Sequence, residues 1–214
     1  QDVYVSELTI RDEFIYVTGS FGGTATFGAH TIASFGFGDI FIAKYDLLGN
    51  CVWVKNLGGA HNDFPGGVCV DQNGNVYIGG AISWSVHFSS GLPTTTNLGG
   101  DDQAFYAKLD SSGTFLFYRI VGNHFADDYV RAIACDDLGN VALTGHYEGL
   151  GYFNPMNSSG DTASSFGNSL DIFVARFSAI GNFIEVKSYG SYGYDCGYDI
   201  IYNGGNNSFS LAGM

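Results

Sequence analysis

A fixed internal period constrains the fold of this 214-residue chain more than any other feature. Four strand-like segments end in glycine, and intervals of 61, 65 and 68 residues separate those glycines. The segments are FIYVTG ending at Gly19, VYIGG ending at Gly80, VALTG ending at Gly145 and FSLAG ending at Gly213. Because self-similarity at a fixed period is typical of stacked repeat architectures, we expect one structural unit to recur along the chain.

A second signature occupies the same place in the first three units. It begins at Asp39 as DIFIAKYD, at Gln103 as QAFYAKLD and at Asp171 as DIFVARFS. The basic residues that share one position in it are Lys44, Lys108 and Arg176. Fixed spacings in three copies favour a structural reading of these repeat positions, including the strand-end glycines.

Each unit reads as four short strands. In the second unit we expect strands at 67–71, 76–81, 104–110 and 114–120, joined by turns that contain Asn or Gly. The strands are apolar on both faces, and helical periodicity is nearly absent. The sequence therefore predicts an all-β fold, a β-propeller-type array of four-stranded blades with about three full blades and part of a fourth.

The spacings place residues 1–214 in a single propeller segment. The repeats are predicted at about 1–62, 63–126 and 127–194, with a partial copy at 195–214. Since a closed propeller takes typically about four to eight blades, we expect the sequence to be a segment of a larger propeller. The remaining blades of the same chain, or another copy, would then be its partners.

Composition excludes several classes of protein. With 45% hydrophobic and 14% charged residues, the chain can bury a core. A net charge of −13 and unclustered basic residues argue against binding to nucleic acid. No apolar run approaches the roughly 20 residues that a membrane-spanning helix needs, so membrane insertion is not expected.

The motifs DQNGNVYIGG, DIFIAKYDLLGNCVW and LGGAHND resemble the SBBP family of bacterial β-propeller repeats. The chain departs from that pattern at Gln103, at Arg176, and at Phe117 and Glu185, which replace the Trp53 of the first unit. The resemblance implies an exported, secreted or cell-surface protein, often from Bacteroidetes and carrying the sorting domain of type IX secretion. It implies no catalytic residues.

Acidic residues recur beside the basic ones. We expect the third-strand bases and the fourth-strand bases Lys55, Arg119 and Lys187 to pair with acids inside each blade. The acids in question are Asp39, Asp63, Asp127, Asp171 and Asp195. The alternative is that these charges form a ring that binds a ligand.

No cofactor is predicted. Asp71 and Asp136 precede Gly-Asn turns, where a short carboxylate caps the turn without a metal. Structural calcium remains the alternative, with Asp63, Asp127 and Asp195 as candidate ligands. The spacing of Cys51, Cys69, Cys135 and Cys196 does not fix their disulfide state, although we expect Cys51 and Cys69 to be buried in strands.

The segment before the third strand varies in length, with 12, 15 and 18 residues separating Phe27, Phe88 and Phe153 from the signature. Variation confined to one position lies on one face of an array, often the binding face. The candidate ligand-binding residues there, suited to stacking on sugars, are Trp84, His87, Tyr147, Tyr152 and Asn154. The alternative is that they belong to solvated connectors.

Two further patterns are weaker. Thr162 lies in Asp161-Thr162-Ala163, which is similar to a bacterial O-glycosylation signal. His61 and His124 lie near acidic residues, but no nucleophile motif accompanies them, so no catalytic residue is predicted.

We therefore predict a non-catalytic, extracellular or cell-surface module for scaffolding, adhesion or recognition. Its partner would be a protein or a glycan at the cell surface. One alternative is a structural subunit of a surface assembly without a small ligand. Another is a carbohydrate-active enzyme with its site on the propeller loops or in the channel.

Overall fold

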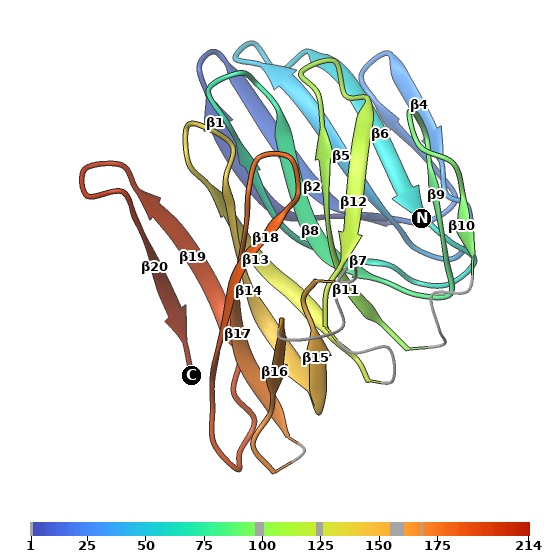
Figure 1. The fold of residues 1–214 in the computed structure, drawn as a ribbon. Coiled ribbons are helices and arrows are strands. Elements are labelled where there is room, and N and C mark those ends of the chain that lie inside the picture. The colour runs from blue at the N-terminus through green and yellow to red at the C-terminus, as the bar shows by residue number, and fades with distance from the viewer. Residues whose placement is uncertain (1, 97–100, 123–125, 155–160, 168) are drawn as a thin grey trace.

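The computed structural model describes residues 2–96, 101–122, 126–154, 161–167 and 169–214 (Figure 1). All regular secondary-structure elements in these ranges are β-strands. No helix long and apolar enough to cross a membrane occurs among these residues. The strands are β1 (Val3–Arg11), β2 (Phe14–Phe21), β3 (Thr24–Phe27), β4 (His30–Ala33), β5 (Asp39–Asp46), β6 (Cys51–Gly58), β7 (Phe64–Val70), β8 (Val76–Ile82), β9 (Ser85–Phe88), β10 (Thr95–Thr96), β11 (Gln103–Leu109), β12 (Phe115–Ile120), β13 (Tyr129–Cys135), β14 (Val141–Glu148), β15 (Leu150–Tyr152), β16 (Thr162–Ser164), β17 (Leu170–Phe177), β18 (Phe183–Tyr189), β19 (Gly197–Asn203) and β20 (Ser208–Gly213).

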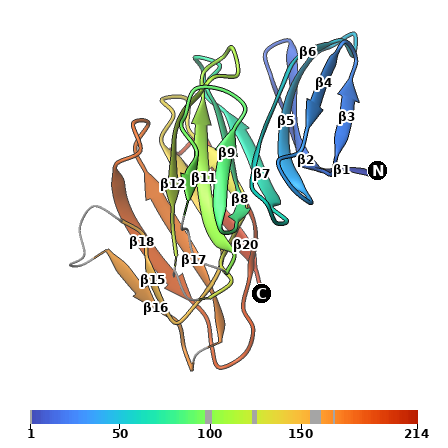
Figure 2. The ribbon, with the colours of Figure 1, turned by 90° about the vertical axis from the view of Figure 1, so that its right-hand side faces the viewer.

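Three blades of four antiparallel strands follow one another along the chain. They are β1-β2-β5-β6, β7-β8-β11-β12 and β13-β14-β17-β18. The hairpin β19-β20 repeats the first half of a blade and packs beside β13. Figure 2 shows the blades side on, stacked from the first in blue to the third in orange. The predicted propeller-type array of four-stranded blades is thus confirmed.

In the three full blades, the repeat glycines lie inside the second strands, two or three residues before the strand ends, and face a bulge in the first strand of the same blade. The register of β1 shifts between Val5 and Glu7, opposite Gly19, and β13 shifts between Val130 and Ala132, opposite Gly145. A Cβ atom on Gly19 would collide with the carbonyl oxygen of Tyr4. Glycine recurs there because the bulged backbone of the neighbouring strand leaves no room for a side chain.

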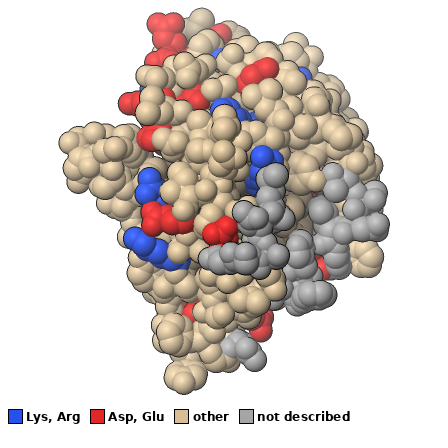
Figure 3. Space-filling view, in the orientation of Figure 1, with Lys and Arg blue, Asp and Glu red and all other residues tan. Residues whose placement is uncertain are grey.

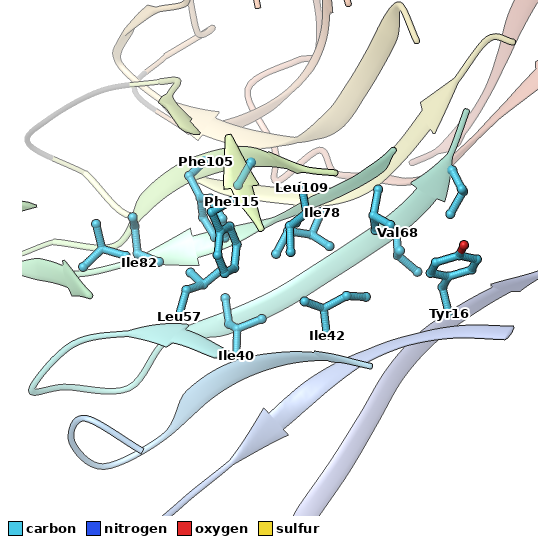
Figure 4. Close-up of a cluster of buried hydrophobic side chains, with 14 of the residues drawn as sticks. Tyr16, Ile40, Ile42, Leu57, Val68, Ile78, Ile82, Phe105, Leu109 and Phe115 are labelled. Atoms are coloured by element: carbon cyan, nitrogen blue, oxygen red, sulfur yellow. The ribbon is translucent and has the colours of Figure 1, made fainter. Parts of the chain in front are cut away.

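Apolar side chains fill the space between successive blades. Ile42 and Leu57 of the first blade point toward Ile78 and Phe105 of the second, and all four are fully buried (Figure 4). The next residue along β11, Tyr106, points the opposite way, into the core that the second blade shares with the third. Each middle strand is therefore apolar on both faces because both faces pack against another layer.

The segment of variable length is a short hairpin rather than a solvated loop in each blade. The hairpins are β3-β4, β9-β10 and β15-β16. The second one also joins the preceding blade, because Leu57 of β6 pairs with Phe88 of β9. In the third, Tyr152 and Gly122 exchange two backbone hydrogen bonds of 2.7 and 2.9 Å. The second and third hairpins therefore each form backbone hydrogen bonds with the preceding blade.

Carboxylates cap the tight turns, as predicted. Oδ1 of Asp136 accepts hydrogen bonds from the amides of Leu138 (2.9 Å) and Asn140 (2.8 Å). Oδ2 of the same residue accepts one from the side chain of Asn140 at 2.7 Å. Asp71 makes the same three contacts in the second blade. Donors of the turn itself thus reach both oxygens of each carboxylate, as expected for an aspartate that caps a turn.

The predicted ion pairs between the recurring bases and acids are wrong. Nζ of Lys44 lies 3.8 Å from the ring centre of Phe14, and Nζ of Lys108 donates a hydrogen bond to the carbonyl of Ala179 at 2.9 Å. Arg176 pairs with Glu185 at 2.8 Å, an acid outside the expected set. The bases lie near the capped turns, whereas Asp39, Asp63 and Asp171 accept hydrogen bonds from backbone amides in the loops at the other end of the strands.

Truncating a side chain in the core between the first two blades tests how much that core contributes to stability. Phe105→Ala removes a fully buried ring between the first two blades and should lower the free energy of unfolding by about 3–5 kcal/mol. Leu48→Ala, at a side chain that is 88% exposed, should change it by less than about 0.5 kcal/mol. Chemical denaturation followed by tryptophan fluorescence measures both. Equal effects would contradict the packing described.

Candidate functional site

The structure separates the residues expected to bind a ligand. Trp84 lies between β8 and β9, and His87 lies in β9. Tyr152 and Asn154 lie in the third blade, where Asn154 donates a hydrogen bond to Asp161 at 2.6 Å. Tyr147 lies in β14 and is fully buried in the core between the second and third blades. Its ring is therefore part of the scaffold and cannot be reached from the surface.

Trp84 opens onto a pocket of about 350 Å³ between the first two blades. Loops at one end of the strands supply its lining residues, which are Phe37, His61, Asn62, Phe64, Ser83, Trp84 and Asp102. Sequence reasoning found Trp84 but missed Phe37 and Phe64. The available sequence signal was an aromatic residue within two positions of a repeat aspartate, Asp39 for Phe37 and Asp63 for Phe64.

Trp84 stands at the tip of a three-residue turn. The amide of Ser85 donates a hydrogen bond to the carbonyl of Ser83 at 2.7 Å, and the φ angle of Trp84 is +62°. A γ-turn with positive φ is rare, and a non-glycine residue there costs of order 1–3 kcal/mol. The indole is 53% exposed and stacks on the ring of His61, with centroids 5.3 Å apart. The strained turn thus holds a large aromatic face toward solvent.

The buried carboxyl group of Asp63 holds this turn in place through hydrogen bonds to the backbone. Its Oδ2 accepts a hydrogen bond from the amide of Gly59 at 2.8 Å, and its Oδ1 accepts one from the amide of Ser83 at 3.2 Å. Asp39 lies beside it, and a Cβ atom on Gly58 would come within 2.6 Å of both carboxyl groups. The repeat aspartate therefore ties the loop of one blade to the turn of the next.

Burial sets the protonation of these carboxyl groups. It raises the pKa of Asp63 to about 8, against the lowering effect of its two backbone hydrogen bonds, and nearby Asp39 and Asp102 raise it further. Burial likewise raises the pKa of Asp39 to about 6. Two carboxyl groups this close and this buried favour the neutral form, so at least one proton is retained near neutral pH.

Further ring contacts extend from the pocket along the same end of the blades. His87 stacks on Phe35 at 5.0 Å, and Phe64 contacts the ring of Tyr129 at 5.7 Å. Tyr129 in turn contacts His146 at 5.1 Å and hydrogen-bonds to Asp102. We call the accessible rings of this set, Phe35, Phe37, His61, Phe64, Trp84, His87 and Tyr129, the aromatic row; His146 lies buried beneath Tyr129. It crosses from the first blade to the third.

The candidate metal ligands do not converge among the residues that the structure describes. Asp63 is buried, Asp127 is exposed and Asp195 is half-buried. Asp127 and Asp195 accept hydrogen bonds from the amides of Asp102 and Ser191. No group of three or more His, Cys, Asp or Glu side chains in the described ranges is arranged to hold a metal ion. The absence of a cofactor stays a prediction, and structural calcium stays its alternative.

The remaining candidates lie outside the aromatic row. Thr162 is half-buried in β16, where it pairs with Tyr152, and its glycosylation stays a prediction. His124 lies outside the described residues. Cys51 and Cys69 are free thiols in β6 and β7, as expected, but both are half-buried at the edges of two cores rather than fully buried.

The raised pKa of Asp63 gives a testable dependence of stability on pH. The folded protein holds a proton there that the unfolded chain releases above its ordinary pKa near 4. The free energy of unfolding should therefore fall as the pH rises from about 4 to about 8. Asp63→Asn should make this fall shallower between pH 5 and pH 8, as measured by urea denaturation.

Asp127→Asn, at the same repeat position but on the surface, is the control and should leave the fall as in the wild type. A wild-type stability that increases steadily from pH 5 to pH 8 would show that Asp63 is not held in its neutral form.

The similarities to known proteins agree with the blade architecture described above. The model of the family described as Beta-propeller repeat (SBBP) matches residues 52–82, which run from β6 through β8 across the first blade junction. The chain is 26% identical over 197 residues to an uncharacterized WD repeat-containing protein of Acanthamoeba polyphaga mimivirus. That alignment covers 82% of this chain and 14% of the relative. The chain is thus a β-propeller-type repeat protein similar to the Beta-propeller repeat family.

Proposed function

We propose that this chain is a non-catalytic recognition module, secreted or at the cell surface, that binds a neutral glycan through the aromatic row. The repeat match and the WD-repeat relative support a protein-interaction scaffold as the general role. The stacked pair of His61 and Trp84 over the pocket is the observation that carries the finer proposal.

The chemistry of the pocket suits a saccharide ring. An exposed indole offers a flat apolar face, on which the C–H face of a sugar can stack. Asn62, Ser83 and Asp102 line the same pocket and supply donors and acceptors for hydroxyl groups. Asp102 makes an anionic sugar unfavourable, because burial next to a carboxylate would bring like charges together.

A non-catalytic role is supported by the state of a cysteine–histidine contact at the edge of the third blade. Nδ1 of His146 lies 3.3 Å from Sγ of Cys196. Burial lowers the pKa of His146 to about 4 and raises the pKa of Cys196, so both groups are neutral at pH 7. A reactive cysteine needs the opposite shift, toward the thiolate. Likewise, Asp39 and Asp63 are too deeply buried to reach a glycosidic bond.

Location outside the cell rests on the SBBP-like motifs of the sequence and on the excess of 21 acidic over 8 basic residues, which keeps an exposed scaffold soluble. Figure 3 shows that most of the visible surface is uncharged, with acidic and basic side chains interspersed. Such a surface fits recognition through aromatic rings and hydroxyl groups better than it fits electrostatic steering of a charged partner.

Substitution of Trp84 tests the proposed binding site. We expect the wild-type chain to bind members of an array of neutral glycans and Trp84→Ala to lose that binding by at least tenfold, because the stacking face is gone. Phe166→Ala is the matched control, since Phe166 is also 53% exposed but lies outside the pocket. Circular dichroism confirms that both variants fold.

Two outcomes would contradict this proposal. If no glycan on the array binds, the ligand is not a neutral saccharide. If Phe166→Ala weakens binding as much as Trp84→Ala does, the aromatic row is not the site.

A further inference from the structure

Two cysteines face each other across the junction between the second and third blades. Cys69 lies in β7 and Cys135 lies in β13, the first strands of those blades. Both side chains pack against the apolar core that the two blades share. The thiol of Cys69 is in hydrogen-bond contact with that of Cys135. The other two cysteines lie elsewhere, since Cys51 packs in the core of the first blade and Cys196 contacts His146.

The register of the two strands brings these side chains together. A Cβ atom on Gly67 would lie 2.7 Å from the amide nitrogen of Ile133, so the two backbones touch at these residues, 66 positions apart. Cys69 and Cys135 are also 66 positions apart, and each lies two residues further along its strand. Because residues i and i+2 of a strand point to the same face, the two cysteines project toward each other.

A second backbone contact lies just beyond the cysteines. In the turns that follow β7 and β13, the amide of Gln72 donates a hydrogen bond to the carbonyl of Asp137 at 3.3 Å. The cysteine pair therefore lies between two contacts of the scaffold, one on each side. The scaffold, and not the thiols, sets the separation of the strands at this point.

Packing alone does not explain why both positions carry cysteine. When the capped turns of the second and third blades are aligned, Cys69 stands at the position of Ala134 in the third blade. Cys135 stands at the position of Val70 in the second blade. Ala134 and Val70 are both buried, so ordinary apolar residues serve at these positions in the neighbouring blade.

We propose that Cys69 and Cys135 are a modification site, which a small disulfide such as oxidised glutathione converts into a covalent link between the second and third blades. The thiolate of Cys135 attacks one sulfur of the oxidant, forms a mixed disulfide and releases one glutathione thiolate. The thiolate of Cys69 then attacks the sulfur of Cys135, closes the new S–S bond and releases the second glutathione. The cysteines lose two electrons and two protons, and the two glutathione molecules gain them.

The surroundings of Cys69 give it the second of these steps. Burial, together with the hydrogen bond to the thiol of Cys135, raises the pKa of Cys69 well above its ordinary value. The thiolate is the reactive form of a cysteine, so Cys69 is poorly suited to attack an oxidant from solution. In the second step its sulfur has only to reach the adjoining Cys135.

The link would act on the scaffold and is separate from the aromatic row, so it goes beyond the recognition role proposed above. It would close a loop of about 66 residues, which restricts the unfolded chain and so favours the folded one. Disulfides form and persist in the oxidising environment outside the cell, the location proposed for this chain.

Peptide mapping tests the proposal, because trypsin places the four cysteines in four different peptides. The complete chain is incubated with oxidised glutathione, its free thiols are alkylated, and it is digested without reduction. We expect a disulfide-linked peptide that joins residues 56–108 to residues 132–176. Cys51 and Cys196 should be recovered in alkylated form.

Thermal unfolding measures what the link does to the fold. The oxidised wild type should unfold at least about 4 °C above the reduced form. Cys69→Ala installs the residue of the equivalent position in the third blade and should unfold at the same temperature in oxidising and reducing buffer. Cys196→Ala is the matched control and should keep both the link and the shift. Circular dichroism confirms that both variants fold.

Three results would overturn the proposal. The first is the absence of a link between the two peptides in the folded chain, whether Cys135 stays free or retains glutathione. The second is a linked peptide that contains Cys51 or Cys196 instead. The third is an equal shift of the unfolding temperature in Cys69→Ala, which would trace the shift to another effect of the oxidant.

Discussion

Burial of both faces of each sheet is the constraint on which the rest of the structure depends. A middle strand such as β11 sends Phe105 into one core and Tyr106 into the next, so no blade can complete its packing alone. The loops, the turn contacts and the inserted hairpins all lie at positions that this stacking fixes. Exposed apolar surface consequently gathers at the two outer layers, on β1 and on β19 and β20.

The sequence predicted the blades well because their determinants are periodic. Strand-end glycines, turn aspartates and apolar signatures each recur at fixed spacing, and each has a local physical cause such as the bulge opposite Gly145 or the cap made by Asp136. The inserted hairpins were missed because their strands are only two to four residues long and their stabilising partner is the previous blade. No pattern within such a short segment reports a contact made 30 residues earlier in the chain.

The candidate site was predictable only in part. Trp84 stood out by composition and by its place in the variable segment, but its stacking on His61 joins residues of two different loops. Tyr147 was assigned to the same segment, yet β14 extends far enough to carry its ring into the core. The bases were expected to pair with recurring acids, and the acids instead serve backbone amides. Spacing along the chain shows which residues are equivalent between blades but not which of them meet.

In the inserted hairpins, the length of the surface segment can change while the packing between neighbouring blades stays the same. Their Phe residues lie at the end of the first hairpin strand or directly after it, with Phe153 fully buried and Phe27 nearly so. The length differences lie beyond these residues, toward the third strand. Residues can therefore be gained or lost after this buried ring without disturbing the joint between blades. Mutation can then remodel this face of the array one blade at a time, and stability places little restriction on how far neighbouring blades diverge there.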